Sequence, residues 1–379
     1  MIWKPHTHDR IADVIGWVQT VLQTGRFPEC DFNGSKWPSN SKEAEKAGDW
    51  FAGGYRFAFS AFKGDWEARV TVHKLQRSYN HNNVCEHCAA TKVQNEFNYR
   101  NFSPRAPYLD VTFTHNDYLL MTPDHLQSHW INVPGWTKDR NLEDLLHVLH
   151  QGVACSVIAG LVCAHVEAKF GEVLTLKGLD DQLQGPVWKH YKSWCRAKKV
   201  PGCGHRFTLT RFGRDAWNVA PELQSCYKAY TVKMLIYWLH AFLEEFKDEA
   251  PGGYTRAHTS YALAKMQHLF DKSGPFLDNN VKDDSVRHGK IFLLLYQSLA
   301  VANLGNPRVN FKVVPKYHSL LHLLLYVART SRNPRYEHCY QDEDLMQQLG
   351  RICSSCHPNT MGKVASNRYR ALLEFGDVF

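Results

Sequence analysis

The chain has no long apolar run and little else that would place it in a membrane or outside the cell. Its longest apolar stretches, such as residues 291–296 and 323–328, are far too short to span a bilayer. The first residues lack the apolar run of a signal peptide. Eleven cysteines, an odd number, without a secretory signal predict reduced thiols. We therefore expect a nuclear or cytoplasmic protein that is neither secreted nor bound to a membrane.

Several enzyme signatures are also missing. The sequence contains no P-loop, no dinucleotide-binding fingerprint and no serine-nucleophile elbow, so it gives no support to those enzyme classes. What it does have is 44% hydrophobic and 13% aromatic residues over 379 positions, which is enough for a full globular core and for two domains. The net charge of +8 permits a nucleic-acid partner without requiring one.

The hydrophobic pattern changes near residue 140. Residues 9–24 read as an amphipathic helix, 26–50 as a loop, and 55–62 and 108–114 as strands. After residue 141, apolar residues recur every three or four positions, which predicts helices. These helices are expected at 142–161, 230–246, 256–271, 282–302, 316–330, 342–356 and 361–375. We predict three parts: an N-terminal helix and loop (1–50), an α/β part (51–140) and a helical domain (141–379).

Two Cys-x-x-Cys pairs, Cys85/Cys88 and Cys353/Cys356, stand far apart in the sequence. Two residues between thiolates allow both sulfurs to face one tetrahedral ion, and two such pairs would complete a four-thiolate zinc shell. A shared structural Zn²⁺ is one hypothesis. The alternatives are ordinary buried thiols, or a zinc ion held by one pair and a nearby histidine such as His87 or His357.

Four segments have residue types that also occur, in this order, in one protein family. They are Gly64-Asp65-Trp66-Glu67-Ala68 with Cys85-x-x-Cys88 after it, Asp144-Leu145-Leu146-His147, Lys316-x-His318-x-x-x-His322-Leu323, and Asp342-Glu343-Asp344-Leu345. Together they resemble the catalytic domain of eukaryotic cut-and-paste DNA transposases of the CACTA type and their Plavaka relatives. The second segment is similar to that family's Asp-x-x-His signature, and the fourth falls where the family has its helical glutamate.

The resemblance implies a partial ribonuclease-H-like α/β core with a large helical domain, and metal-dependent cleavage and strand transfer of DNA. Asp65, Asp144 and Glu343 would then be the catalytic carboxylates, with His147 orienting the site or the DNA. Asp65 and Glu343 would hold Mg²⁺ or Mn²⁺, because two-metal phosphoryl chemistry needs carboxylate ligands. DNA would be the partner, and a homo-oligomer is possible. Asp342 and Asp344 are the fallback residues for the role of the glutamate.

Each of these residues also has a purely structural interpretation. Asp65 could cap the helix that follows it, although we predict that its carboxylate faces a cleft instead. Asp144 and Asp342 could stabilise helix starts, and His147 could lie on a half-buried helix face. His318 and His322 share one helical face and could bind a metal, but the Leu-rich helix around them favours a core position.

One departure from the family pattern weakens the enzyme hypothesis. Only 64 residues precede Asp65, and one convincing strand lies among them, whereas the family has three strands and a helix there. The chain is therefore expected to be a degenerate, truncated or domesticated relative. The alternative is a non-enzymatic, zinc-stabilised helical module that binds nucleic acid or protein. The aromatic and basic segment 188–196 could contact DNA in either case, or could pack on the body as an amphipathic helix.

Overall fold

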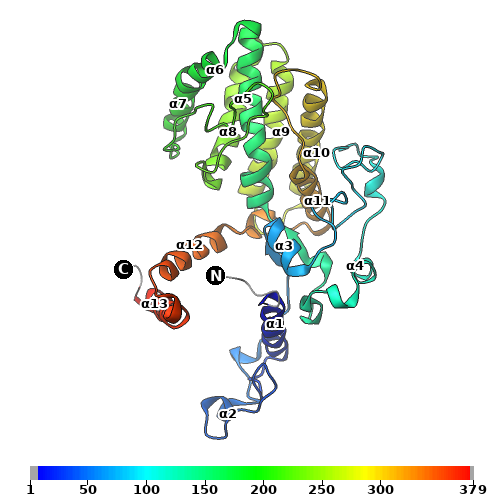
Figure 1. The fold of residues 1–379 in the computed structure, drawn as a ribbon, viewed down its shortest axis with the longest axis vertical. Coiled ribbons are helices and arrows are strands. Elements are labelled where there is room, and N and C mark those ends of the chain that lie inside the picture. Colours follow the sequence, from blue (N-terminus) through cyan, green and yellow to red (C-terminus); the bar gives the residue numbers. More distant parts are fainter. Residues whose placement is uncertain (1–6, 376–379) are drawn as a thin grey trace.

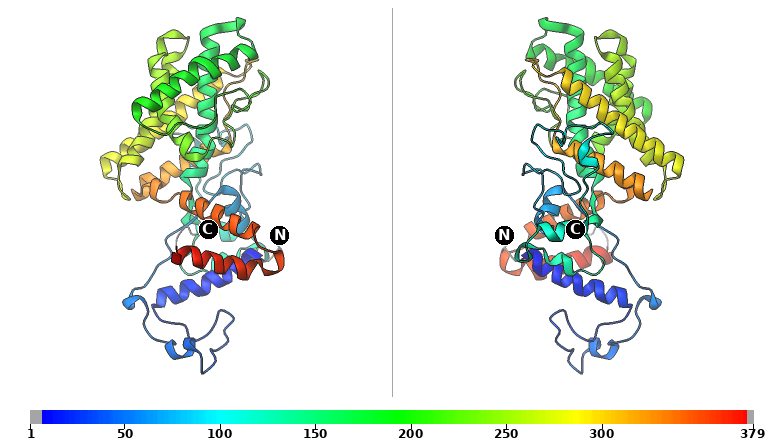
Figure 2. Two further views of the ribbon diagram at one scale, coloured as in Figure 1. Left: turned by 90° about the vertical axis from the view of Figure 1, so that its left-hand side faces the viewer. Right: turned by 90° about the vertical axis from the view of Figure 1, so that its right-hand side faces the viewer.

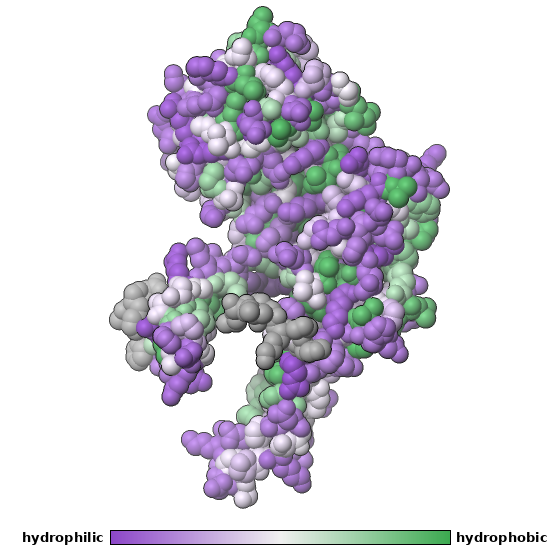
Figure 3. Space-filling model, viewed as in Figure 1, coloured by the Kyte–Doolittle hydropathy of each residue, from purple (hydrophilic) through white to green (hydrophobic). Residues whose placement is uncertain are grey.

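The computed structural model describes residues 7–375, and most of this chain is helical. Figure 1 shows a bundle of long helices at one end of an elongated molecule, with α1 and α2 at the other end. Between them lie a two-stranded sheet and a loop-rich region. Hydrophilic residues cover most of the face seen in Figure 3.

The helical bundle contains the elements that the apolar periodicity predicts. In α8 the buried side chains include Val232, Leu235 and Leu239, which lie three or four residues apart on one face. The long helices pack around one continuous apolar core. The bundle helices are α5 (Ala154–Phe170), α6 (Leu176–Gln182), α7 (Trp188–Lys198), α8 (Ala229–Glu245), α9 (Gly253–Lys272), α10 (Asn279–Ala302) and α11 (Pro315–Thr330).

The helix that leads into α5 is distorted. Leu146–Val153 forms a π-helical stretch in which Gly152 has non-helical backbone angles. A Cβ at Gly152 would lie 2.6 Å from the carbonyl oxygen of His147, so only glycine fits at this position. The 28 residues Leu146–Val173 are also apolar and long enough to cross a membrane, contrary to our expectation, but 89% of the most apolar 18-residue stretch is buried inside the protein. It is a central core helix of the bundle.

The sheet is smaller than the sequence pattern predicts. It consists of β1 (Phe62–Gly64) and β2 (Asn141–Glu143), which pair in parallel so that Phe62 faces Asn141 and Gly64 faces Glu143. Residues 55–61 have no regular secondary structure, so the predicted strand 55–62 is correct only at its end. The predicted strand 108–114 is wrong, because Pro107–Leu109 forms a 3-10 turn and Thr114 caps the next helix.

Short helices surround the sheet, and a second, smaller apolar core lies beside it. This core packs α1 and its neighbours around Trp130 and Trp136. The helices of this part are α1 (Thr7–Thr24), α2 (Lys42–Lys46), α3 (Trp66–His73) and α4 (His115–Met121). A further π-helical stretch is Leu183–Val187, and the 3-10 turns are Ala52–Gly54, Pro107–Leu109, Asp124–Leu126, His129–Asn132, Lys138–Arg140, Gly171–Val173, Lys247–Glu249, Pro334–Tyr336 and Pro358–Thr360.

The chain ends in two helices that pack on each other, α12 (Tyr340–Ser354) and α13 (Met361–Phe375). Figures 1 and 2 show them below the bundle, at the level of α3 and α1. Both helices occur where the sequence predicts them. The first turn of α12 reaches the end of the sheet, because Asp342 forms a 2.7 Å ion pair with Lys63 of β1.

Candidate metal centre and carboxylate cleft

A group of two cysteines and two histidines lies between the loop after α3 and helix α11. The ligand atoms of Cys85, Cys88, His318 and His322 are all within 4.8 Å of one another. The Cys88 sulfur lies 3.3 Å from Nε2 of His318 and 3.4 Å from Nε2 of His322, and the two Nε2 atoms are 3.1 Å apart. Two thiolates and two imidazoles around tetrahedral zinc would show S···N separations of about 3.5 Å. This group could bind a metal such as zinc.

The loop that carries the two cysteines is fixed by half-buried Arg77 and buried Lys138. Arg77 donates hydrogen bonds to the carbonyl oxygens of Cys85 at 2.7 Å and of Cys88 at 3.1 Å, and Lys138 donates to that of Glu86 at 3.3 Å. A hydrogen bond from Cys85, together with the charge of Arg77, holds the pKa of the Cys88 thiol below its usual value. These contacts shape the loop and favour one thiolate, the form that binds metals.

The four-thiolate shell expected from the two Cys-x-x-Cys pairs does not form. Cys353 and Cys356 are half-buried at the far end of α12, and the Cys356 thiol donates to the carbonyl oxygen of Ile352 at 3.1 Å. The first turn of α12 reaches the sheet, and Cys353 is ten residues further along, or about 15 Å of helix. The histidine pair of α11 takes their place. Its spacing of four residues is the sequence signal for this site, although we assigned the pair to the core.

The predicted catalytic residues lie around a separate cleft of about 430 Å³ at the end of the sheet. Asp65 directly follows β1 and Asp144 directly follows β2. Because the strands are parallel and adjacent, their carboxyl ends meet at one edge, and both carboxylates line this cleft. His147 from the π-helical stretch and Lys316 from α11 line the same cleft.

Asp144 is 1% exposed, and both of its oxygens are engaged. One oxygen accepts from the backbone N–H groups of Leu146 at 3.2 Å and Cys339 at 2.9 Å. The other accepts from the N–H and from Nδ1 of His147, at 3.2 and 2.5 Å. Burial acts to raise the pKa of Asp144, but these bonds outweigh it, and the pKa is lowered. Asp144 is thus an ionised group that orients His147.

His147 connects the remaining carboxylates. Its Nε2 lies 3.4 Å from Oε1 of Glu343, whose side chain is 56% exposed at the start of α12. Burial acts to lower the pKa of His147, but the charges of Asp144, Glu343 and Asp65 raise it. Asp65, Asp144, His147 and Glu343, which are widely separated in sequence, are therefore neighbours in the structure.

Asp65 both caps helix α3 and lines the cleft. Its Oδ1 accepts a hydrogen bond from the N–H of Ala68 at 2.6 Å, so it caps α3, and our expectation that it would not cap its own helix is wrong. It lines the cleft nevertheless. Asp342 is paired with Lys63, and within residues 7–375 no group of three close metal ligands includes Asp65, Asp144 or Glu343.

A buried arginine, which the sequence analysis missed, links the cleft to the metal-binding loop. Arg69 of α3 is 1% exposed and forms 2.6 Å ion pairs with Glu86 and with Glu143. Glu86 and His87 lie between the two cysteines, and Nε2 of His87 is 3.4 Å from a carboxylate oxygen of each glutamate. The helical spacing of Arg69 from Asp65 is the only signal for it in the sequence.

The aromatic and basic segment 188–196 forms most of α7 and packs on the bundle. Tyr191 is fully buried, and Trp188 lies edge-on to Phe207 with ring centroids 5.0 Å apart. Its aromatic residues therefore contribute to the core, as expected for an amphipathic helix.

Neither a family model, nor a curated protein, nor a solved structure matches this chain. Inference about its function therefore rests on the geometry of the two sites and on the resemblance of the short motifs.

Proposed function

We propose that this protein is a zinc-stabilised, transposase-like DNA-processing protein of the CACTA/Plavaka type. The observation that carries the proposal is that Asp65, Asp144 and His147 line one cleft, with Glu343 3.4 Å from His147. The motif resemblance selects the same four residues.

The end of the sheet supports a reduced ribonuclease-H-like core. Two parallel strands each end in an aspartate, and a later helix brings a glutamate to the same place. The helical bundle lies between Asp144 and Glu343 in sequence, so it would be an insertion within that core. The part that is reduced is the sheet, which has two strands within the described residues.

Each residue of the cleft would have its own role, either in metal binding or in positioning. Asp65, through the oxygen not used for capping, and the exposed Glu343 are the carboxylates with free lone pairs for Mg²⁺ or Mn²⁺. An ion held there would neutralise charge on a DNA phosphate. Asp144 holds His147 with Nε2 directed toward Glu343, and Lys316 adds a positive charge at the wall of the cleft.

The Cys₂His₂ group would hold a structural zinc ion. It would join the loop at residues 85–88 to α11, and through Glu86 and Arg69 it would fix one wall of the cleft. Bound zinc contributes directly to the free energy of folding.

One observation favours a second candidate, a non-enzymatic zinc module that binds nucleic acid or protein. Asp144 has no free oxygen, which leaves two carboxylates where two-metal chemistry often uses three. In that case the cleft would bind phosphate through Lys316 and His147 without cutting.

Nicking of supercoiled plasmid by the full chain with Mn²⁺ separates the candidates. Asp65→Asn keeps a capping side chain but removes the charge, and Glu343→Gln keeps the size of the side chain. We expect each to reduce nicking by about 100-fold or more. Asp181→Asn, at an exposed position of α6 that does not line the cleft, is the control and should nick normally. DNA binding without nicking by the folded, zinc-loaded wild type would favour the second candidate.

A further inference from the structure

A groove of about 620 Å³ adjoins the carboxylate cleft. It lies between the loop at residues 94–101, the end of α10 and the segment 311–314. Val314 lines both the groove and the cleft, and an ion pair joins Lys312 of the groove to Glu222 of the cleft. A polymer bound in the cleft could therefore continue into the groove.

The loop presents a free guanidinium to the groove at its boundary with the cleft. Nε of Arg100 donates a hydrogen bond to the hydroxyl of Tyr99 at 3.1 Å, and that hydroxyl donates to the carbonyl oxygen of Val313 at 2.9 Å. These bonds hold the exposed Arg100 next to Val313, one residue from the boundary at Val314. Within residues 7–375 its two terminal nitrogens have no hydrogen bond or ion pair, so they are free to bind a phosphate.

Two amide nitrogens in the lining are also free. The side-chain oxygen of Gln297 accepts from the N–H of Phe102 at 2.9 Å, and that of Asn101 accepts from the N–H of Ser103 at 3.0 Å. Because a backbone N–H can only donate, these bonds fix the amide oxygens and leave each NH₂ group as the free donor. Neither nitrogen has a partner in the described part of the chain, and neither is fully buried. The groove therefore offers donors from three side chains.

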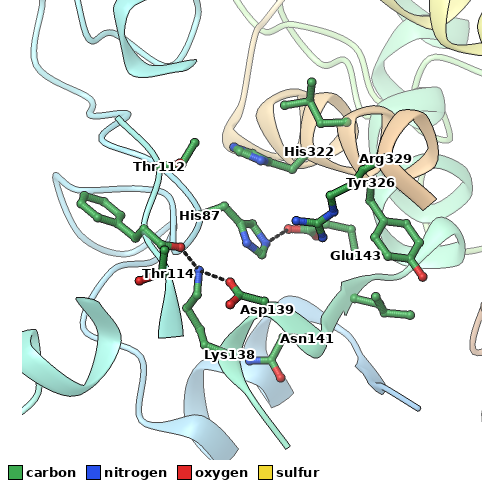
Figure 4. Close-up of a pocket in the computed structure, with 13 residues that line it drawn as sticks. His87, Thr112, Thr114, Lys138, Asp139, Asn141, Glu143, His322, Tyr326 and Arg329 are labelled. Carbon is green, nitrogen blue, oxygen red and sulfur yellow. Dashed lines mark hydrogen bonds and ion pairs between the residues drawn. The ribbon is translucent and has the colours of Figure 1, made fainter. Parts of the chain in front are cut away.

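The groove suits a negatively charged ligand better than the other cavity beside the cleft does. No carboxylate is among its described lining residues. The other cavity, of about 330 Å³, lies between β2 and α11 and shares Glu143 with the cleft (Figure 4). Asp139 also lines it, and its Lys138 is already paired with Asp139 at 3.2 Å. Phosphates that leave the cleft would therefore be repelled from that cavity and attracted into the groove.

The end of α10 gives the groove an exposed apolar wall. Val301 is 57% exposed, and Leu304, just beyond the helix, is 77% exposed. The half-buried ring of Phe311 lines the groove as well. Unpaired bases can pack on such side chains, whereas a duplex turns its bases inward. Donors together with an apolar surface match the phosphates and the bases of a single strand.

We propose that this groove binds an unpaired strand of the DNA that occupies the neighbouring cleft. The donors of Arg100, Asn101 and Gln297 would bind the backbone, and the bases would pack on Leu304 and Phe311. The groove would thus select DNA that is already melted next to the phosphate in the cleft. The choice of DNA as the ligand rests on the proposed function, whereas the groove itself rests on its lining.

The test compares a blunt duplex with a forked duplex, in which the two strands separate at one end into unpaired tails of about ten thymidines. Both contain the same number of nucleotides, so they carry the same charge, and each is titrated by fluorescence anisotropy with the full-length, zinc-loaded chain. We expect the forked duplex to bind about tenfold more tightly. Arg100→Gln and Leu304→Ser, at exposed positions where misfolding is not expected, should each reduce this preference by about threefold or more. Arg100→Gln should also lower the slope of log affinity against log salt concentration by about 0.7.

Arg329→Gln removes an exposed arginine from the lining of the other cavity, so it is the matched control and should keep the preference. Equal binding of the two duplexes by the wild type would overturn the groove while leaving DNA binding intact. A preference that Arg329→Gln removes and Arg100→Gln does not would overturn it too. If neither duplex binds, the proposed function fails, and titration with single-stranded oligothymidine then decides the groove. Binding that Arg100→Gln weakens would support it, and absent or unweakened binding would overturn it.

Discussion

In the bundle, α8 alone buries seven side chains in one apolar core, whereas residues 74–106 contain no α-helix and no strand of the sheet. This loop region buries fewer apolar side chains, among them Val84, Tyr99 and Phe102, and polar contacts add to them: the Cys₂His₂ group, the hydrogen bonds of Arg77 and the ion pairs of Arg69. Apolar burial is distributed over many side chains, so the bundle tolerates the loss of any one of them. The loop region instead depends on a few groups, and it should fail when one of those is removed.

Loss of the metal should have the largest effect and should be confined to the loop region. Structural zinc contributes on the order of 10 kcal/mol in small domains, which is large beside the few buried apolar side chains of this loop. Chelation, or Cys88→Ser, should remove amide-exchange protection from residues 80–113 while α8 and α9 remain protected, as mass spectrometry can measure. Cys353→Ser is the matched control and should change neither zinc content nor protection, because Cys353 lies outside the group. Less than about half an equivalent of zinc in the folded wild type would contradict this prediction.

Removing Arg69 should be the next most damaging change. Arg69→Met would leave Glu86 and Glu143 buried without their cation, which typically costs about 3–5 kcal/mol. Denaturant titration measures the loss. Lys177→Met, which breaks an exposed pair with Asp181, is the comparison and should cost no more than about 0.5 kcal/mol. Similar losses in the two variants would show that the buried ion pairs contribute little.

A cavity in the bundle should reduce stability without affecting the loop. Leu239→Ala removes a fully buried side chain of α8 and should cost about 3 kcal/mol in the free energy of unfolding. Because α8 packs mainly on α5 and α9, away from the histidines of α11, zinc binding should remain stoichiometric in the folded variant. A fall in the zinc content of the folded variant would mean that the two regions are not separable in the way proposed here.

The smallest predicted effect is an acid lability around His73, in the small core beside the sheet. Burial, and then the charge of Arg69, lower the pKa of His73 to about 3. The unfolded chain therefore takes up a proton near pH 6.5 that the folded chain resists. Above pH 6.5 this histidine does not reduce the free energy of unfolding. As the pH falls from 6.5 toward 3 the free energy of unfolding decreases, by about 2 kcal/mol between pH 7 and pH 5.

His73→Phe, which fits the aromatic surroundings of Phe62, Trp130 and Trp136, should make unfolding less dependent on pH in that window. His268→Gln, at an exposed position of α9, should follow the wild-type profile. An unchanged pH profile in His73→Phe would show that His73 does not account for the lability.

The sequence predicted the bundle well because its signals are long and local. A helix such as Gly253–Lys272 repeats its apolar spacing over five turns, and the predicted range 256–271 lies within it. The strands were harder to predict, because a ladder of three residues leaves almost no periodicity to detect. The run at 108–114 has strand-like residues, yet its surroundings form turns.

The candidate sites also divide into residues that a local motif marks and residues that only the three-dimensional fold brings together. Asp65, Asp144, His147 and Glu343 were found because short motifs identify residue types without regard to distance in sequence. His318 and His322 were not predicted as the partners of Cys85 and Cys88, because they are 230 or more residues away in sequence. Cys353 and Cys356 were equally good candidates by residue type, and only the folded path of the chain decides between the two pairs. Arg69 was missed because its only local signal is its helical spacing from Asp65, whereas its burial and its pairing with two glutamates depend on the fold.

Helix α12 is attached to the body at one end only, so it can rotate about its first turn. The hydrogen bonds and ion pairs that tie it to the body come from its first turn, through Tyr340, Asp342 and Glu343. The helix continues for about 16 Å beyond that point. A rotation about the first turn would move Glu343 little, while α13, packed on the far part, would sweep through a much larger arc. A partner bound to α13 would therefore rotate α12 about its first turn, and that rotation would change the distance between Glu343 and His147 by a small amount.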